Sequence, residues 1–208
     1  MDKELSFGLV GCGKIAIRHA SLLSSGEIRG ARLAAVCDVD SARSAEFGAR
    51  FNVETYTNAM QMAKMDEMDV LSILTPSGLH AENIIELAPF GKPIVVEKPM
   101  SLTLRDADRV IEACDRSGAK LFVVKQNRFN EPVRQLRKAL DAGRFGQLTM
   151  GTVRVRWCRP QSYYDEAPWR GTWEHDGGVL TNQASHHIDL LVWMMGEVES
   201  VFAKATRS

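Results

Sequence analysis

The sequence predicts an α/β fold whose N-terminal part is a doubly wound parallel sheet. Short apolar runs alternate with amphipathic runs from Leu5 to about Lys125, which is typical of strands followed by helices. A glycine-rich turn follows the first apolar run, and turn-forming or polar residues follow the later ones. Because crossovers between parallel strands are right-handed, this order predicts a sheet with helices on both faces.

The individual elements follow from the same pattern. Six short runs rich in strand-forming residues predict strands over 7–10, 32–38, 53–56, 69–74, 93–97 and 121–124. The stretches between them predict helices over 14–25, 42–50, 58–64, 81–88 and 104–117. Pro89 and Gly91 end the fourth helix, and Gly118 ends the fifth.

The turn after the first strand has the pattern G-x-G-x-x-A, formed by Gly11, Gly13 and Ala16. Gly11 permits a sharp turn, Gly13 leaves room for a pyrophosphate, and Ala16 lets the helix lie close to the strand. The N–H groups at the helix start, at Lys14 and Ile15, would face the phosphates. An ordinary glycine turn is the alternative. The position between a strand and a helix favours a dinucleotide site, and thus a Rossmann domain over residues 1–126.

Asp38 ends the second predicted strand. A carboxylate at this place would accept hydrogen bonds from the adenosine ribose and repel a 2′-phosphate, which favours NAD over NADP. Arg43 lies a few residues further on and could meet such a phosphate. The alternative role for Asp38 is the N-cap of the next helix, although Asp40 or Ser41 could equally fill that role.

Ligands of doubly wound sheets lie outside the carboxyl ends of the strands. Five predicted strands each end at such a position, namely Gly11, Asp38, Thr75, Glu97 and Gln126. We therefore expect these five residues to converge on one crevice.

The composition excludes several classes of partner. The 208 residues include 26 basic and 26 acidic side chains, dispersed along the chain, so neither a nucleic-acid footprint nor a polybasic membrane patch is expected. The four cysteines lack C-x-x-C spacing, which fits a reducing cytoplasm, and we predict no metal site. Strand-forming sequence begins almost at once, so we expect no signal peptide, and no apolar run is long enough to span a bilayer.

The pattern changes after Gln126, and residues 127–208 are predicted to begin a second, α+β domain. We expect helices over 132–142 and 178–195, strands over 148–157 and 199–205, and a loop over 159–173. Arg154, Arg156 and Arg159 alternate with Val155 and Trp157, which indicates either a solvated strand face or a grip on an anionic substrate. Two long strands leave an open sheet with unpaired edges, so we expect truncation or obligate assembly.

Two stretches carry candidate catalytic groups. Glu97-Lys98-Pro99 follows a buried strand and places a lysine at the crevice, with a Lys98–Pro99 bond that is a candidate for the cis form. A surface lysine in a turn is the alternative. In the second stretch, helical spacing sets Asn182, His186 and Asp189 on neighbouring faces. A histidine can take a hydroxyl proton while a hydride leaves the same carbon, whereas a satisfied polar residue is the simpler role, which we assign to His187 and His175.

Four motifs together resemble the glucose-fructose oxidoreductase and inositol dehydrogenase family (Gfo/Idh/MocA). They are the glycine turn, Thr75-Pro76 with His80, Glu97-Lys98-Pro99, and G-G-x-L-x-N-x-x-x-H-x-x-D from Gly177. They occur in family order and span nearly the whole chain. The resemblance implies a Rossmann domain for NAD or NADP, and a second domain whose large open sheet supplies a sugar pocket and an oligomer interface. It also implies that Lys98 and His186 are the catalytic pair.

The chain departs from many members of that family at Asn182, where they have an aspartate. An amide can orient a sugar hydroxyl or His186, but it cannot accept a proton, so Lys98 and His186 must suffice. Members of the family are also longer than this chain, which agrees with the open sheet expected above.

Four segments carry a closer resemblance, namely 125–130, 163–164, 169–173 and 181–183. They resemble the branch of the family that oxidises nucleotide-linked sugars, notably UDP-N-acetylglucosaminuronic acid at C3. The resemblance implies cofactor contacts from Gly11, Gly13, Lys14, Ile15 and Asp38, with Thr75, Pro76, His80, Glu97 and Gln126 lining the nicotinamide half. The expected substrate residues are Arg128, Arg156, Arg159, Tyr164, Trp169, Arg170 and Asn182, because arginines can pair with a uronate or diphosphate and aromatic rings stack on sugars and bases. Oxidation of a free sugar or an inositol-type polyol is one alternative, and a truncated NAD-binding chain without turnover is another.

Overall fold

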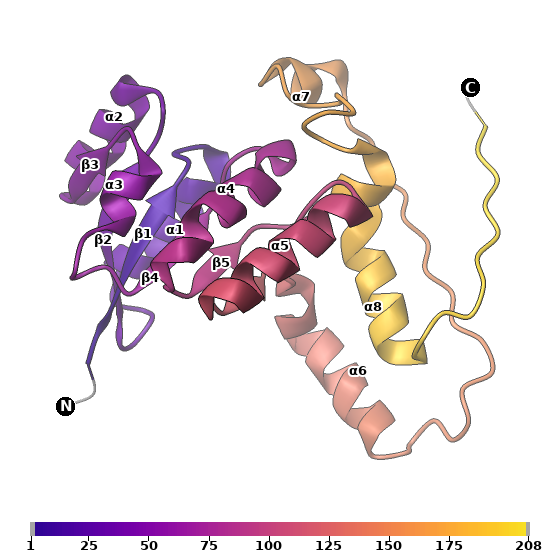
Figure 1. Cartoon of the computed structure of the whole chain (residues 1–208). Coiled ribbons are helices and arrows are strands. Elements are labelled where there is room, and N and C mark those ends of the chain that lie inside the picture. Colours follow the sequence, from indigo (N-terminus) through magenta and orange to yellow (C-terminus); the bar gives the residue numbers. More distant parts are fainter. Residues whose placement is uncertain (1–2, 207–208) are drawn as a thin grey trace.

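The computed structural model describes residues 3–206, and its N-terminal part is a six-stranded, wholly parallel sheet (Figure 1). The strand order is β3-β2-β1-β4-β5-β6. The strands are β1 (Leu5–Val10), β2 (Ala31–Cys37), β3 (Glu54–Tyr56), β4 (Val70–Ile73), β5 (Ile94–Val96) and β6 (Leu121–Val123). All six predicted strands are therefore confirmed. The strand order reverses between β1 and β4, and the crevice at such a switch point is where these sheets bind ligands.

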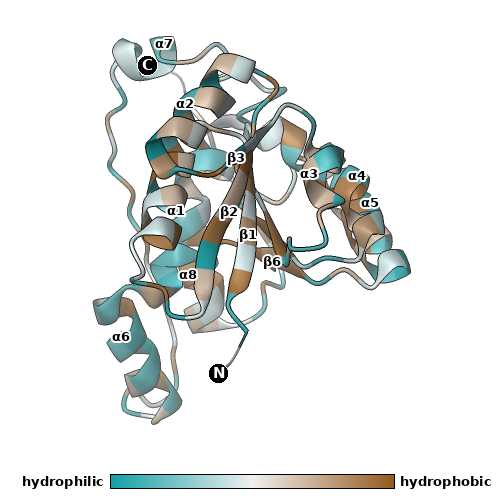
Figure 2. Cartoon of the chain, turned by 90° about the vertical axis from the view of Figure 1, so that its left-hand side faces the viewer, coloured by the Kyte–Doolittle hydropathy of each residue, from teal (hydrophilic) through white to brown (hydrophobic). Residues whose placement is uncertain are grey.

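Helices cover both faces of the sheet, with α1 and α2 on one face and α3, α4 and α5 on the other (Figure 2). Their bounds are α1 (Lys14–Ser24), α2 (Ser41–Phe51), α3 (Ala59–Ala63), α4 (His80–Leu87) and α5 (Leu104–Ser117). Side chains of a strand alternate between its two faces, so Leu9 and Val10, neighbours in β1, enter opposite cores. The apolar strands of the sequence pattern are thus buried from both sides.

The ends of these helices explain why they stop and start where they do. The Asp40 carboxylate accepts hydrogen bonds from the N–H groups of Ala42 and Arg43 and caps α2. Gly118, with φ of 70°, ends α5 in the left-handed conformation that favours glycine.

The C-terminal part packs three further helices beside the sheet (Figure 1). They are α6 (Glu131–Asp141), α7 (Gln161–Asp165) and α8 (Ser185–Met195), and a π-helical turn (Leu180–Ala184) leads into α8. The predicted helix over 178–195 is confirmed, because these residues are helical throughout and the π-helical turn interrupts only the regular α-helical pattern. The short helix α7 lies within a segment predicted to be a loop.

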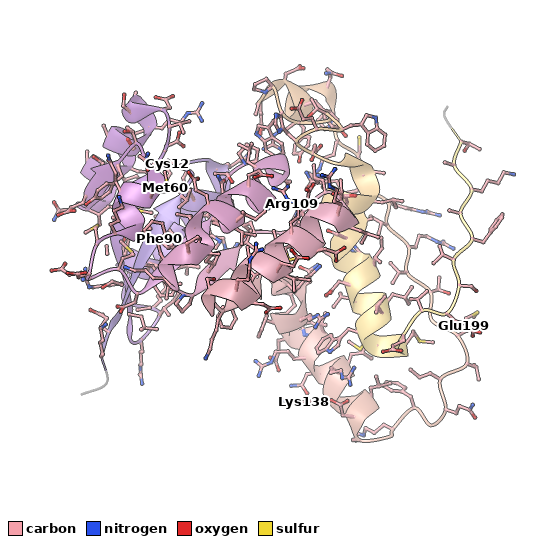
Figure 3. All side chains as sticks on the ribbon, viewed as in Figure 1. Cys12, Met60, Phe90, Arg109, Lys138 and Glu199 are labelled. Carbon is pink, nitrogen blue, oxygen red and sulfur yellow. The ribbon has the colours of Figure 1, made fainter. Side chains whose placement is uncertain are left out.

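The two strands predicted in the C-terminal part are wrong for this structure. Residues 148–157 and 199–205 are extended, but neither pairs with another strand among the described residues. Glu199 lies on the C-terminal segment, which runs apart from the sheet (Figure 3), and Val201 and Phe202 are 83% and 92% exposed. Apolar alternation becomes a strand only where a second strand satisfies its backbone groups, and these segments have no such partner here.

Residues 3–206 contain neither a membrane-spanning helix nor a cluster of metal-binding side chains. No helix there combines the length and apolar character needed to cross a bilayer. The same residues contain no group of three or more histidine, cysteine or acidic side chains that could hold a metal ion.

Candidate active site

The glycine turn joins β1 to α1 and has the shape that a dinucleotide phosphate needs. Gly11 has φ of 99°, and a Cβ atom there would lie 2.9 Å from the backbone of Leu74 and Thr75. A Cβ atom on Gly13 would meet nothing within 4 Å, so the space before α1 is open. In the described part of the chain no side chain caps α1, and the N–H groups of Lys14 and Ile15 begin that helix. An anion therefore fits at this helix start.

Asp38 holds the turn to the end of β2. Its Oδ2 accepts a hydrogen bond from the Cys12 N–H at 2.8 Å, and its Oδ1 accepts one from the Asp40 N–H at 2.9 Å. Each carboxylate oxygen can accept a further bond, which leaves capacity for ribose hydroxyls. Asp40, not Asp38, caps α2, and Arg43 pairs with Asp40 at 3.3 Å. The arrangement fits an unphosphorylated ribose.

Lys98 follows β5 and reaches across to the C-terminal part of the chain. Its Nζ donates to both the backbone O and the Oδ1 of Asn182, each at 2.9 Å, and the Lys98–Pro99 bond is cis. An ammonium has three N–H donors, so one remains for a ligand. Burial lowers the pKa of Lys98, although the negative charges of Glu97 and Asp176 oppose the effect. The structure thus brings together the two motifs that the sequence singled out.

Asp176 is a site residue that the sequence analysis did not select. It is 5% exposed, its Oδ1 accepts a hydrogen bond from Asn182 Nδ2, and its Oδ2 accepts one from the Gly171 N–H at 2.7 Å. Asn182 itself is 7% exposed. The only sequence signal for Asp176 is its place directly before two glycines.

His186 lies in the first turn of α8 and is partly buried. Its pKa is lowered by burial and by the positive charges of Lys98 and Lys125. The imidazole is therefore neutral at pH 7 and able to accept a proton.

Asp189, one helical turn further along α8, is bound by Arg128. The guanidinium donates from Nε to Oδ2 at 2.8 Å and from Nη2 to Oδ1 at 2.7 Å. In such a bidentate ion pair the Asp189 carboxylate neutralises the charge of Arg128. Arg128 thus ties the segment after β6 to α8, and its expected contact with a substrate stays a prediction.

Glu97 links α1 to the end of β5. It accepts a hydrogen bond from Lys98 N–H at 3.1 Å, and His19 of α1 lies with Nε2 3.2 Å from its Oε1. Burial raises the pKa of Glu97, but the bond from His19 and the neighbouring positive charges outweigh it and lower the pKa overall. His19 was missed because a single histidine within an amphipathic helix carries no motif.

His80 supports the site from behind. It is 1% exposed, and its ring nitrogens lie 2.6 Å from the Pro99 O and 2.8 Å from the Thr75 O. It was expected to line the nicotinamide half, but its buried ring instead ties the loop after β4 to the Lys98–Pro99 segment. Thr75 donates its hydroxyl to Asn83 Oδ1 at 2.8 Å.

The other predicted cofactor positions lie on loops at the carboxyl ends of their strands. Pro76 is partly buried and directly precedes the 3₁₀ turn Ser77–Leu79. Gln126 is exposed and begins the 3₁₀ turn Gln126–Phe129 after β6.

Some of the predicted substrate residues gather around Tyr163. The Arg159 guanidinium lies 4.6 Å and that of Arg170 4.1 Å from the Tyr163 ring, and Tyr164 packs edge-on against it at 5.2 Å. Arg159 also donates to Gln183 Oε1 at 3.0 Å, which connects this cluster to the π-helical turn beside Asn182.

Two further substrate predictions have different outcomes. Trp169 lies 5.3 Å from the Arg170 guanidinium and so joins the cluster. Arg156 is exposed on the extended segment that was predicted to be a strand. Arg170 also pairs with Glu166 at 3.3 Å, and Lys14 at the start of α1 reaches the same carboxylate at 3.3 Å.

The strand order and the open glycine turn at the start of α1 define a dinucleotide-binding protein of the Rossmann class. A family model described as "Oxidoreductase family, NAD-binding Rossmann fold" matches residues 5–125, and one described as "GFO/IDH/MocA C-terminal domain" matches residues 133–208. The chain belongs to the GFO/IDH/MocA family, and its N-terminal part is an NAD-binding Rossmann domain.

Known proteins of this family are similar along nearly the whole chain. Inositol 2-dehydrogenase from Rhizobium meliloti strain 1021 is 33% identical over 96% of this chain and 57% of its own length. The WlbA dehydrogenase from Bordetella pertussis, solved with NADH and UDP-GlcNAcA, is 43% identical with a TM-score of 0.87, over 93% of this chain and 59% of that one. The WlbA dehydrogenase from Chromobacterium violaceum, solved with the same two molecules, is 41% identical with a TM-score of 0.88, over 94% and 56%. The chain thus spans little more than half the length of these proteins.

Proposed function

We propose that the protein is an NAD-dependent dehydrogenase that oxidises C3 of a UDP-linked N-acetylated uronic acid. The observation that carries the proposal is the contact of Lys98 with Asn182, which joins the end of β5 to the segment that holds His186. The identity of 41–43% to two dehydrogenases solved with NADH and UDP-GlcNAcA supports the substrate class.

The roles of the residues follow from their charges. A bound nicotinamide would supply the hydride acceptor. His186, kept neutral because burial and nearby cations lower its pKa, takes the proton of the C3 hydroxyl as general base. Lys98 donates its remaining N–H to the same oxygen and stabilises the negative charge that develops there. Asn182 holds Lys98 in place with both of its oxygens.

The cluster around Tyr163 is proposed to receive the anionic and planar parts of the substrate. Arg159 and Arg170 supply positive charge, and aromatic faces beside them suit stacking on a sugar or a base. We also propose that the C-terminal part mediates homo-oligomer formation, since its extended segments expose apolar side chains such as Met150 and Phe202.

Two other functions remain in competition with this proposal. Identity of 33% to an inositol 2-dehydrogenase favours oxidation of a free polyol or sugar. The unpaired segments 148–157 and 199–205 favour an NAD-binding chain without turnover.

The test is NADH formation by the 208-residue chain with NAD and a panel of UDP-sugars, free sugars and inositol. The proposal predicts absorbance at the NADH band only with a nucleotide sugar. Activity with inositol or a free sugar alone would support the polyol alternative. NAD binding without any turnover would support the non-catalytic alternative. His187→Asn is the matched control for His186→Asn, because His187 has no assigned role.

A further inference from the structure

Asp176 is a buried carboxylate whose charge no cation contacts directly among residues 3–206. Its hydrogen-bond donors are the Gly171 N–H and the side-chain amide of Asn182. Burying a carboxylate is costly unless hydrogen bonds and an opposite charge compensate for it. The nearest such charge along the hydrogen-bond chain is Lys98, which donates to the other end of the Asn182 amide at 2.9 Å.

We propose that Asp176 is a positioning residue for Lys98 that acts through the amide of Asn182. An ionised carboxylate can only accept hydrogen bonds, and an ammonium can only donate them. Asp176 therefore holds the NH₂ group of Asn182 toward itself, which turns the amide oxygen toward Lys98. In the opposite orientation the NH₂ group would face the ammonium. The inference rests on the proposed function, because it concerns the lysine assigned to stabilise the substrate oxygen.

The charges around Lys98 show what Asp176 contributes. Two carboxylates, Glu97 and Asp176, favour the charged lysine, whereas burial and the cations Lys125 and Arg159 disfavour it, and His186 lies near enough for Lys98 to lower its pKa. Asp176 is thus one of two groups that keep the lysine protonated. Loss of its charge favours release of the Lys98 proton at a lower pH.

Exchanging the two side chains gives a sharp test. In Asp176→Asn, the new amide oxygen can still accept from the Gly171 N–H, but its NH₂ group then faces the NH₂ group of Asn182. Relief of that conflict turns Asn182 so that it presents NH₂ to Lys98. In the double variant Asp176→Asn with Asn182→Asp, the amide now at position 176 accepts from the Gly171 N–H and donates to the carboxylate now at position 182, which accepts from Lys98. Every hydrogen bond is restored and the carboxylate contacts Lys98.

The experiment is an NMR titration of the 208-residue chain labelled at its lysine side chains, with the Lys98 signal assigned by its loss in Lys98→Met. We expect Asp176→Asn to shift the Lys98 titration to lower pH, and the double variant to return it to the wild-type position or above. Asp165→Asn, which removes an exposed carboxylate in α7, is the control and should leave it unchanged.

A Lys98 titration that is the same in Asp176→Asn and wild type would overturn the proposal. If the single variant displaces its own loop, as tryptophan fluorescence would show, the double variant decides, and a Lys98 titration below the wild-type position would then overturn it. No sugar is oxidised in this measurement. Failure of the proposed dehydrogenase activity is therefore distinguishable from failure of the inference.

Discussion

Gly78 lies directly against the backbone of the C-terminal part of the chain. A Cβ atom there would overlap the Glu174 carbonyl oxygen and lie 2.8 Å from His175 Cα, and the Gly78 N–H donates to the His175 carbonyl at 3.0 Å. The obstructing atoms belong to backbone and cannot rotate away. In Gly78→Ala the loop that carries Asp176 must therefore move off the domain.

The size of the effect follows from two contributions. Overpacking costs about 1–3 kcal/mol, and the lost hydrogen bond costs about 1 kcal/mol. A total of about 2–4 kcal/mol corresponds to a shift of about 30-fold to about 700-fold in the equilibrium between the docked and undocked loop. Because Lys98 contacts this segment through Asn182, undocking should also separate Lys98 from its proposed catalytic partner His186.

Amide hydrogen exchange at position 78 measures the docked fraction directly, because that N–H donates to the His175 carbonyl across the contact. We expect faster exchange in Gly78→Ala with NAD affinity kept, since the glycine turn is unchanged. Gly13→Ala is the control. It should keep the wild-type exchange rate but weaken NAD binding, because a Cβ atom at position 13 meets only the open space proposed for a phosphate. An unchanged exchange rate at position 78 in Gly78→Ala would show that the added methyl group does not undock the loop.

Three more predictions concern the proposed catalytic pair and the cysteines. Lys98→Met and His186→Asn should each lower kcat by at least about 100-fold while calorimetry shows NAD affinity kept; wild-type turnover in either would remove that residue from the mechanism. The pKa of His186 and that of Lys98 both lie below their ordinary values, so the base stays neutral and the acid loses its proton at lower pH than usual. The acid limb of the pH–rate profile, set by His186, should then lie below pH 6.5, and the alkaline limb, set by Lys98, below pH 10.5. An acid limb above 6.5 or an alkaline limb above 10.5 would contradict the assignment. Burial raises the pKa of Cys12 to about 12 and that of Cys37 to about 11, so a thiol reagent at pH 8 should modify exposed Cys158 first; early reaction of the other two would contradict their burial.

The Rossmann domain could be predicted because each of its signals is local. Val70–Ile73 is apolar throughout apart from Ser72, as suits a strand covered on both faces, and Gly11 is required by its own φ and by the backbone beside it. The proximity of the two motifs was also expected, because the family resemblance implies that Lys98 and His186 act as a pair. The direct bonds from Lys98 to Asn182 were not expected.

Other features could not be predicted because they depend on distant neighbours. Arg128 was expected to bind an anionic substrate, and the fold places Asp189 against it. Asp176 and His19 gained roles only from contacts with Asn182 and Glu97, which lie far away or carry no spacing signal. Alternation over 148–157 indicated a strand, but no second strand lies beside it in the described chain.

The proposed reaction moves a hydride from C3 of a nucleotide-linked sugar to NAD. The most direct measurement uses UDP-N-acetylglucosaminuronic acid deuterated at C3, with NAD, and locates the deuterium in the products by mass spectrometry and NMR. The proposed reaction gives deuterium at C4 of the reduced nicotinamide and a 3-keto sugar. Reduced cofactor without deuterium, or deuterium retained on the sugar with NAD bound, would contradict it.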